Sequence, residues 1–259
     1  MDAGYDPLFL GAAAPLPAGA AGTVRLAYPR FTVALDPDRR LAAVTAVNID
    51  GATLRDLPRT GDWEFDARVP TAQQAGPEIY ARNDLDRGHL VRRRDPGWGD
   101  PVTARIATEA TFRYPNAAPQ ASGFNQSKEL WLGLEDHVLE YADATDQRLS
   151  VFTAPVLADD DPPYRGIRIP LRFWKIAAWL SPAGLAAAGF ILDQSDLIDT
   201  RTGAVTPPPL GGFRTFQVPV QRIAEVTGLD VGTLTDADVL GSQGVTAARP
   251  LEDPQDIVL

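Results

Sequence analysis

Hydrophobic and polar positions alternate or run in short apolar stretches over much of the chain, which is the pattern of β-strands. Two such stretches, 31–35 and 41–49, flank the turn residues Asp36-Pro37-Asp38 and predict a β-hairpin. Four further stretches predict strands: 149–157, 171–180, 185–192 and 213–218. Because these runs lack the regular alternation with helices that parallel sheets show, we expect an antiparallel sheet.

Helical spacing of apolar residues is clearest between Ser127 and Asp146. Leu130, Leu134 and Val138 recur on one face of a predicted helix there. A shorter helix is predicted over 220–227, with Gly228 as its C-terminal cap. The fold class expected is therefore α+β, with an antiparallel sheet core flanked by helices.

Domain organisation is simple in this pattern. Residues 1–22 are rich in Ala, Gly and Pro and predict a loosely attached, flexible arm, followed by a single domain over 23–259. Residues 50–80 predict an irregular excursion, and the region beyond Leu229 is acidic with little pattern. Trp174 and Trp179 fall within strand runs and are expected in the core.

Composition sets broad limits. The 259-residue chain is 44% hydrophobic and 22% charged, which is ordinary for a globular domain. Its longest apolar run, 185–192, is too short to cross a bilayer, so no membrane partner is expected. The absence of cysteine excludes disulfides and thiolate metal sites. The N-terminus lacks the positive start of a signal peptide, so a cytoplasmic location is the default, with leaderless export left open.

The segment Asp84-Leu85-Asp86-Arg87-Gly88-His89-Leu90 holds one of only two histidines. Arginines stand at 82, 87, 92, 93 and 94, although the whole chain carries a net charge of −10. A base near neutral pH beside arginines is the set that phosphodiester hydrolysis requires. The alternative is a surface histidine on an exposed basic strip, and this segment alone leaves the two interpretations even.

Four ordered motifs shift that balance. After Asp86-Arg87-Gly88-His89 come Phe112-Arg113-Tyr114-Pro115-Asn116-Ala117-Ala118-Pro119-Gln120, then Phe124-Asn125-Gln126, then Leu130-Trp131-Leu132-Gly133-Leu134-Glu135. With Trp63-Glu64-Phe65-Asp66 upstream, they resemble the DNA/RNA non-specific endonuclease family, the endonuclease G-like ββα-metal nucleases. The resemblance is strongest over residues 30–195 and implies an antiparallel fold whose histidine strand packs on the helix from Ser127.

The resemblance also implies a role for each site residue. His89 would take a proton from water, and Arg87 would bind the scissile or a neighbouring phosphate. Asn116 would support the histidine. Asn125 would ligate Mg²⁺, or Mn²⁺ or another divalent cation in its place, through its amide oxygen, and Glu135 would hold the waters around that ion.

Departures from the family pattern concern charge and spacing. The family has an arginine two residues before the upstream tryptophan. That position is Gly61 here, and Arg59 is the nearest arginine that could replace it. The arginine position one turn after the glutamate is Leu139, so its phosphate contact is lost or supplied by the adjacent arginines Arg92, Arg93 and Arg94.

Spacing differs as well. Asn125 and Glu135 lie ten residues apart, against about eight in familiar members, so one regular helix does not point both at one ion. Asn125 is therefore expected before the regular helix or beside a bulge. His137 lies far around that helix from Glu135 and is expected at the surface. Asp193 to Asp199 resembles no complete calcium loop and predicts a solvated turn, with a position facing the cleft left open.

The sequence thus predicts a magnesium-dependent endonuclease that cleaves DNA and RNA without sequence or sugar specificity. No Gly-x-Ser-x-Gly elbow or phosphate-binding Walker loop competes with this interpretation. The alternative is a nuclease-like module that has lost catalysis and binds nucleic acid or protein. Control by an inhibitor or regulatory protein is expected, and the oligomeric state is left open.

Overall fold

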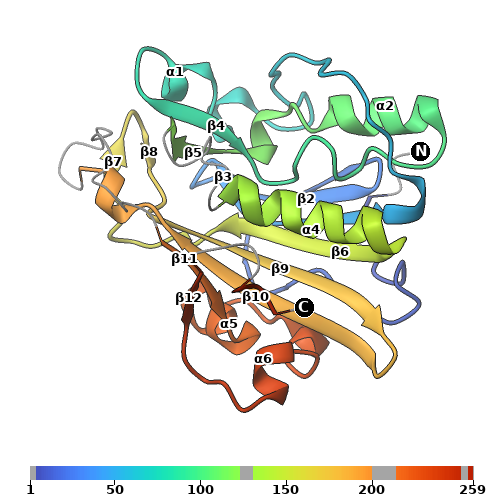
Figure 1. Cartoon of the computed structure of the whole chain (residues 1–259). Helices are drawn as coiled ribbons and strands as arrows, with labels where there is room; N and C mark the ends of the chain where they lie inside the picture. Colours follow the sequence, from blue (N-terminus) through green and yellow to red (C-terminus); the bar gives the residue numbers. More distant parts are fainter. Residues whose placement is uncertain (1–3, 123–130, 200–213, 252–255, 259) are drawn as a thin grey trace.

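The computed structural model describes residues 4–122, 131–199, 214–251 and 256–258, with the backbone alone for 131–137 and 214. Its largest element is an eight-stranded sheet in which every neighbouring pair is antiparallel (Figure 1). In sheet order the strands are β1 (Val24–Tyr28), β2 (Phe31–Asp36), β3 (Leu41–Asp50), β6 (Arg148–Pro155), β9 (Arg172–Ser181), β10 (Gly184–Asp193), β11 (Arg214–Val218) and β12 (Arg249–Leu251). The predicted hairpin is β2–β3, and the four further runs correspond to β6, β9, β10 and β11.

A smaller two-stranded ribbon lies beside this sheet. It pairs β4 (Leu85–His89) with β5 (Ala117–Ala121), antiparallel, and the next described helix along the chain is α4 (Trp131–Thr145). Two strands followed by a helix form the ββα unit that the resemblance implied. The residues expected to start this helix, 127–130, lie outside the described part of the chain. A second short ribbon joins β7 (Pro163–Tyr164) and β8 (Ile167–Arg168).

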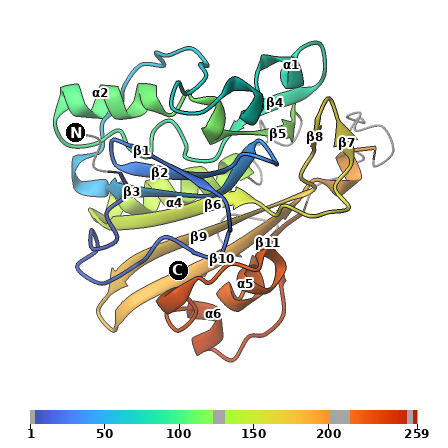
Figure 2. The same ribbon diagram turned by 180° about the vertical axis from the view of Figure 1, so that it is seen from behind.

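Helices cover both faces of the sheet, as the two opposite views show (Figures 1 and 2). On one side lie α4, α1 (Pro77–Tyr80), α2 (Pro101–Ala110) and the β4–β5 ribbon; we call this side the α4 face. On the other lie α5 (Val220–Thr227) and α6 (Val239–Ser242), and we call it the α5 face. Short 3₁₀ turns complete the description at Gly51–Thr53, Thr71–Gln73, Tyr114–Asn116, Ser195–Leu197 and Gly232–Leu234.

Side-chain alternation along β9 explains why both faces are covered. Phe173, Ala177 and Trp179 enter the core of the α4 face, whereas Trp174 and Ile176 enter that of the α5 face. A strand that is apolar on both sides needs cover on both sides. Trp174 and Trp179 are 0% and 5% exposed, so the expectation that they are core residues is confirmed.

The N-terminal segment is packed, in contrast to the flexible arm expected over residues 1–22. Tyr5, Leu10 and Ala14 are buried in the core of the α5 face. The Tyr5 hydroxyl donates to the carbonyl of Ala14 at 2.6 Å, and Ala18 forms a bridge with Asp230. Widely spaced apolar residues among Ala, Gly and Pro show no regular period, yet they fill a groove that the sheet and α5 leave open.

Two other elements show where local signals suffice. Helix α5 spans the residues predicted, and Gly228 follows it in the left-handed conformation at φ 69°. Helix α2 was not predicted, although Asp100 caps it by accepting from the amide of Thr103 at 2.8 Å and Pro101 occupies its first turn. In the stretch expected to be a solvated turn Asp196 is exposed, but Gln194, Leu197 and Ile198 are buried, so the stretch is solvated only in part. Within the described residues, no helix has the length and apolar character needed to cross a membrane.

Candidate active site

His89 lies at the end of β4, where strand geometry places it on the same side as Arg87. Gly88, between them, points the other way, toward Gln120 on β5. A Cβ at residue 88 would come 2.1 Å from the Gln120 side-chain oxygen, so no larger residue fits without moving buried structure. The Asp-Arg-Gly-His sequence therefore needs its glycine to let β5 approach.

Asn116 fixes the end of the histidine strand. Its side-chain oxygen accepts from the amide of Val91 at 2.8 Å, and its amide nitrogen donates to the carbonyls of Val91 and Thr111, both at 2.9 Å. Its backbone carbonyl accepts from the amide of Leu90 at 3.0 Å. Because Asn116 is fully buried and bonded to backbone throughout, it supports His89 through the strand.

Two aromatic rings enclose the imidazole. The ring centroid of Trp63 lies 4.6 Å from that of His89, and the ring of Phe112 lies 4.9 Å away, edge to face. Trp63 and Phe112 also contact one another at 5.5 Å. These contacts restrict the orientation of the His89 ring and remove it from water on two sides.

The enclosure changes the protonation of His89. Burial, and then the positive charges of Arg59, Arg93 and Arg92, lower the pKa of its imidazole to about 3. The residue as a whole is partly exposed, but its Nε2 atom is buried and has no hydrogen-bond partner among the described residues. The imidazole is thus neutral at physiological pH and has a nitrogen lone pair to accept a proton.

Arginines gather around this histidine. Arg59 is exposed and lies 5.7 Å from the Phe112 ring, next to the imidazole. Arg93 donates to the carbonyl of Leu57 at 2.9 Å, and burial together with Arg94, Arg59 and Arg92 lowers its pKa. Like charges that depress one another's pKa form a positive surface suited to an anion.

Arg87 is exposed on the His89 side of β4, with its guanidinium 5.5 Å from the ring of Tyr80. The positive charges of Arg59, Arg93 and Arg92 act on the imidazole, and the charge of Arg94 acts on Arg93.

The proposed metal ligands are only partly described. Asn125 lies outside the described residues, and for Glu135 and His137 the backbone alone is described, in the first turns of α4. Among the described residues, no three His, Asp or Glu side chains cluster in a way that would hold a metal ion. Leu139, at the family's arginine position, is buried in the core of the α4 face, so it belongs to the packing of the helix.

Sequence reasoning gave no role to several residues that build this site. Trp63 and Phe112 belong to the quoted motifs, but nothing in their spacing showed that both touch His89. Gln194 is fully buried, accepts from the amide of Ala121 at 3.0 Å and donates to the carbonyl of Pro170 at 2.7 Å. It thereby fastens β5 to the main sheet, a role that one buried glutamine does not reveal in a sequence.

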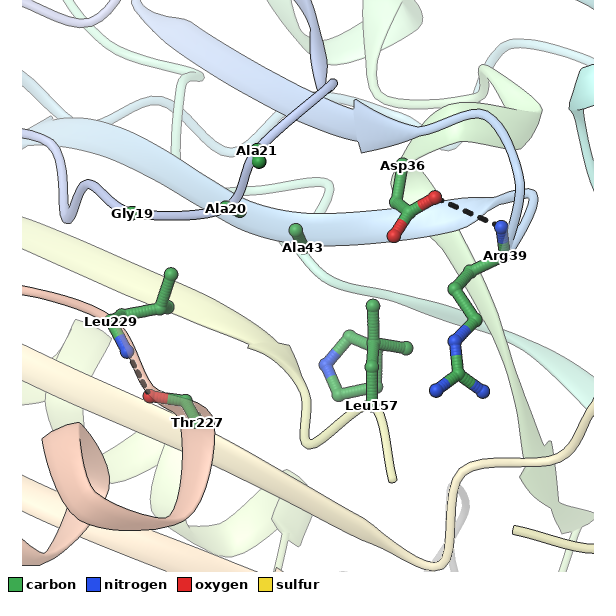
Figure 3. Close-up of a pocket in the computed structure, with 10 residues that line it drawn as sticks. Gly19, Ala20, Ala21, Asp36, Arg39, Ala43, Leu157, Thr227 and Leu229 are labelled. Carbon is green, nitrogen blue, oxygen red and sulfur yellow. Dashed lines mark hydrogen bonds between the residues drawn. The ribbon is translucent and has the colours of Figure 1, made fainter. Parts of the chain in front are cut away.

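A different concavity of about 200 Å³ lies near α5, between the N-terminal segment and the β2–β3 turn (Figure 3). Its charged lining residues are Asp36 and Arg39. Asp36 accepts from the amide of Arg39 at 2.9 Å, and Arg39 bonds the carbonyl of Ala158 and the carboxylate of Asp159. Asp36 thus holds the turn and Arg39 ties the turn to the segment after β6, so this concavity lacks the chemistry found around His89.

Known proteins resemble this chain in both sequence and fold. Residues 14–238 match the family model for DNA/RNA non-specific endonuclease. An uncharacterized protein, y4fB of Sinorhizobium fredii (strain NBRC 101917 / NGR234), is 42% identical over 224 residues, which is 82% of this chain. The chain spans about a third (34%) of the length of that relative.

A crystal structure of the EndoG/EndoGI complex, solved to explain EndoG inhibition, contains a similar chain. It superposes with a TM-score of 0.61 at 18% sequence identity, covering 82% of this chain and 86% of the other. At that identity the likeness concerns the fold, and it confirms the antiparallel sheet with flanking helices.

Proposed function

Because the chain belongs to the DNA/RNA non-specific endonuclease family, we propose that it is a metal-dependent endonuclease hydrolysing phosphodiester bonds of both DNA and RNA. The observation that carries this proposal is the neutral His89 imidazole at the end of the ββα unit, surrounded by arginines. This is a base and an anion site in one place.

In the proposed reaction His89 accepts a proton from the attacking water. A base must be unprotonated at the working pH, and the lowered pKa of His89 keeps it so, while the same lowering makes the imidazole a weaker proton acceptor. Trp63 and Phe112 hold the ring, and Asn116 holds the strand that carries it. Because water is the nucleophile, a ribose 2′-hydroxyl is not required, and DNA serves as well as RNA.

The arginines bind the substrate backbone. Arg87 is proposed to grip the scissile or an adjacent phosphate, with Arg59 and the run Arg92, Arg93 and Arg94 on neighbouring phosphates. Guanidinium groups bind phosphate oxygens in pairs, and phosphate contacts position nucleic acid without reading its sequence. The acidic remainder of the chain limits adhesion elsewhere, since the net charge is −10.

A divalent cation completes the proposal. The donors available for it are an amide oxygen at Asn125 and a carboxylate at Glu135, a hard oxygen set in a chain without cysteine, and this chemistry fits Mg²⁺. Mn²⁺ or another divalent cation can take its place. When bound, the ion supplies positive charge to the phosphate and to the leaving oxygen. Asn125 would hold the ion directly, and Glu135 would hold waters around it.

Control by another protein is part of the proposal. The similar chain in the solved structure was crystallised in a complex concerned with inhibition of EndoG. A non-specific nuclease endangers the nucleic acid of its own cell. We therefore propose that an inhibitor or regulatory protein covers the surface formed by Arg59, Arg92, Arg93 and Arg94.

Incubation of the protein with double-stranded DNA, single-stranded DNA and RNA, in Mg²⁺ and in chelator, tests the proposal. We expect cleavage of all three only with the metal, 5′-phosphate ends, and binding that weakens steeply with salt. Strict RNA dependence, a single site-specific cut or 2′,3′-cyclic ends would contradict it. Binding without cleavage would favour the alternative, a nuclease-like module that has lost catalysis.

A further inference from the structure

Lys175 is a buried lysine in the middle of the main sheet. It is 2% exposed and shares the α4 face of β9 with Phe173 and Ala177. Its Nζ donates to the hydroxyl of Thr153 on the neighbouring strand β6 at 2.8 Å. A cation in such a position is expensive to desolvate and calls for a reason.

A small cavity of about 10 Å³ shows what the lysine faces. Its lining joins three parts of the molecule: the sheet through Ile49, Val151 and Lys175, helix α4 through Val138, and the segment after β4 through Asp95. Asp95 is itself only 5% exposed. Opposite charges therefore border one buried space, which has room for about one water molecule.

Asp95 ends the arginine run of the proposed site. Its carboxylate accepts from the backbone amide of Arg92 at 3.3 Å, and its own amide donates to the carbonyl of Arg92 at 3.1 Å. The position of the Asp95 carboxylate thus sets the turn that presents Arg92, Arg93 and Arg94. Helix α4 borders the same cavity through Val138. Glu135 precedes Val138 by three residues, just under one turn of the helix.

Packing alone does not favour a lysine here. Replacing buried ionic groups by apolar residues of similar size is often neutral or stabilising for a fold. Methionine has nearly the length of lysine and would fill this space without a charge. The charge at Lys175 is therefore better explained by what it holds than by the stability it adds.

We propose that Lys175 is a positioning residue of the nuclease site. Across the buried cavity, its charge holds the Asp95 carboxylate and so fixes the arginine turn, together with the α4 turn that carries Glu135, on the sheet. This inference rests on the proposed function. Lys175 on β9 would contact neither the substrate nor the metal ion and would act on the site through Asp95.

Lys175→Met tests the proposal, with Lys175→Arg as the conservative variant. We expect Lys175→Met to fold with an unfolding temperature at or above that of the wild type. Its kcat for DNA cleavage should fall about 10–100-fold, the range for residues that orient a metal site, while KM changes little. Lys175→Arg should recover a large part of kcat.

The matched control is Gln217→Leu. Gln217 is also fully buried and lies on β11, where its side chain bonds the backbone of Val258 at 2.7 and 3.0 Å. The variant removes a buried polar group from the same sheet, on a strand two places away from the strand of Lys175. This variant should keep kcat even if it lowers the unfolding temperature.

Two further measurements do not depend on cleavage. Amide hydrogen exchange at residues 92–96 should be faster in Lys175→Met, and calorimetric Mg²⁺ binding should be weaker. An inactive wild type would defeat the proposed function, whereas faster exchange in that variant would still support the positioning role. Unfolding of Lys175→Met, unchanged kcat, or a loss of kcat that Gln217→Leu shares would overturn the inference.

Discussion

The two faces of the main sheet bury polar groups for different purposes. On the α5 face Asp238 accepts from the amides of Val220 and Leu240 at 3.0 and 3.1 Å, which caps two helices. Asn48 and Ser150 bond one another at 3.3 Å. On the α4 face the buried groups include the unpartnered Nε2 of His89 and the charges at Lys175 and Asp95.

The two faces therefore differ in what their buried polar groups do. The α5-face groups named above satisfy backbone or one another, which is what a stable core requires, whereas the buried Nε1 of Trp174 on the same face has no hydrogen-bond partner among the described residues. The α4 face keeps a depressed histidine pKa and like charges close together, arrangements that favour chemistry at the expense of stability. Mutations on the two faces should therefore separate stability from activity.

The largest stability effect is expected on the α5 face. Ile223 is fully buried on α5, so Ile223→Ala should lower the free energy of unfolding by about 2–5 kcal/mol through lost burial and a cavity. The kcat of the folded fraction should stay at the wild-type value, because α5 lies across the sheet from His89. Denaturant unfolding and cleavage assays on one sample measure both. A fall in kcat larger than the unfolded fraction explains would show that the α5 face also contributes to activity.

A smaller effect, on substrate binding, is expected from Arg59→Ala. Loss of a hydrogen bond to a charged group should weaken DNA binding by about 1.5–3 kcal/mol, and the dependence of log K on log salt should become shallower by about one unit. Stability should hardly change, since Arg59 is exposed. Arg25→Ala on the outer strand β1 removes the same charge from an exposed position and serves as control. Equal loss of affinity in the two variants would show that net charge alone matters.

The third effect concerns the proton on His89 and appears only in acid. Its folded-state pKa, about 3, lies below the unfolded value of about 6.5, so the unfolded chain binds the proton more tightly. Stability from this group is present above pH 6.5 and is lost as the pH falls toward 3. One imidazole signal should therefore show no titration between pH 8 and about 5 in an NMR experiment.

Only two histidines are present, so His137→Gln assigns the spectrum. Trp63→Leu should move the His89 titration and the acid limb of kcat/KM upward, because the indole helps to exclude water from the ring. If wild-type His89 titrated near 6.5, the enclosed imidazole described above would not exist in solution.

Strands and helices with a strong local pattern could be predicted from the sequence. The β2–β3 hairpin and α5 with Gly228 followed directly from alternation, turn residues and a glycine cap. The packed N-terminal segment could not, because its contacts from Tyr5 and Leu10 depend on a groove that only the folded sheet creates. Helix α2 was missed although Asp100 and Pro101 mark its start.

The same division holds at the candidate site. His89, Arg87 and the arginine run were found because the motif places them next to one another in sequence. Trp63 and Phe112 touch His89 from positions 26 residues before and 23 after it, and Lys175 and Asp95 line one cavity although 80 residues separate them. Residues so far apart in the sequence are brought together by the topology of the folded chain, which the spacing of residues does not reveal.

The role of His89 as the base is tested by cleavage of one end-labelled double-stranded DNA in Mg²⁺ by wild type and His89→Ala. Circular dichroism and DNA binding should match between the two proteins, because His89 caps no helix and its ring packs only against Trp63 and Phe112 in the site. We expect the wild type to cut throughout the strand and the variant to be slower by about 10²–10⁴-fold, the contribution of a positioned base. A folded His89→Ala variant that cleaves at nearly the wild-type rate would contradict it.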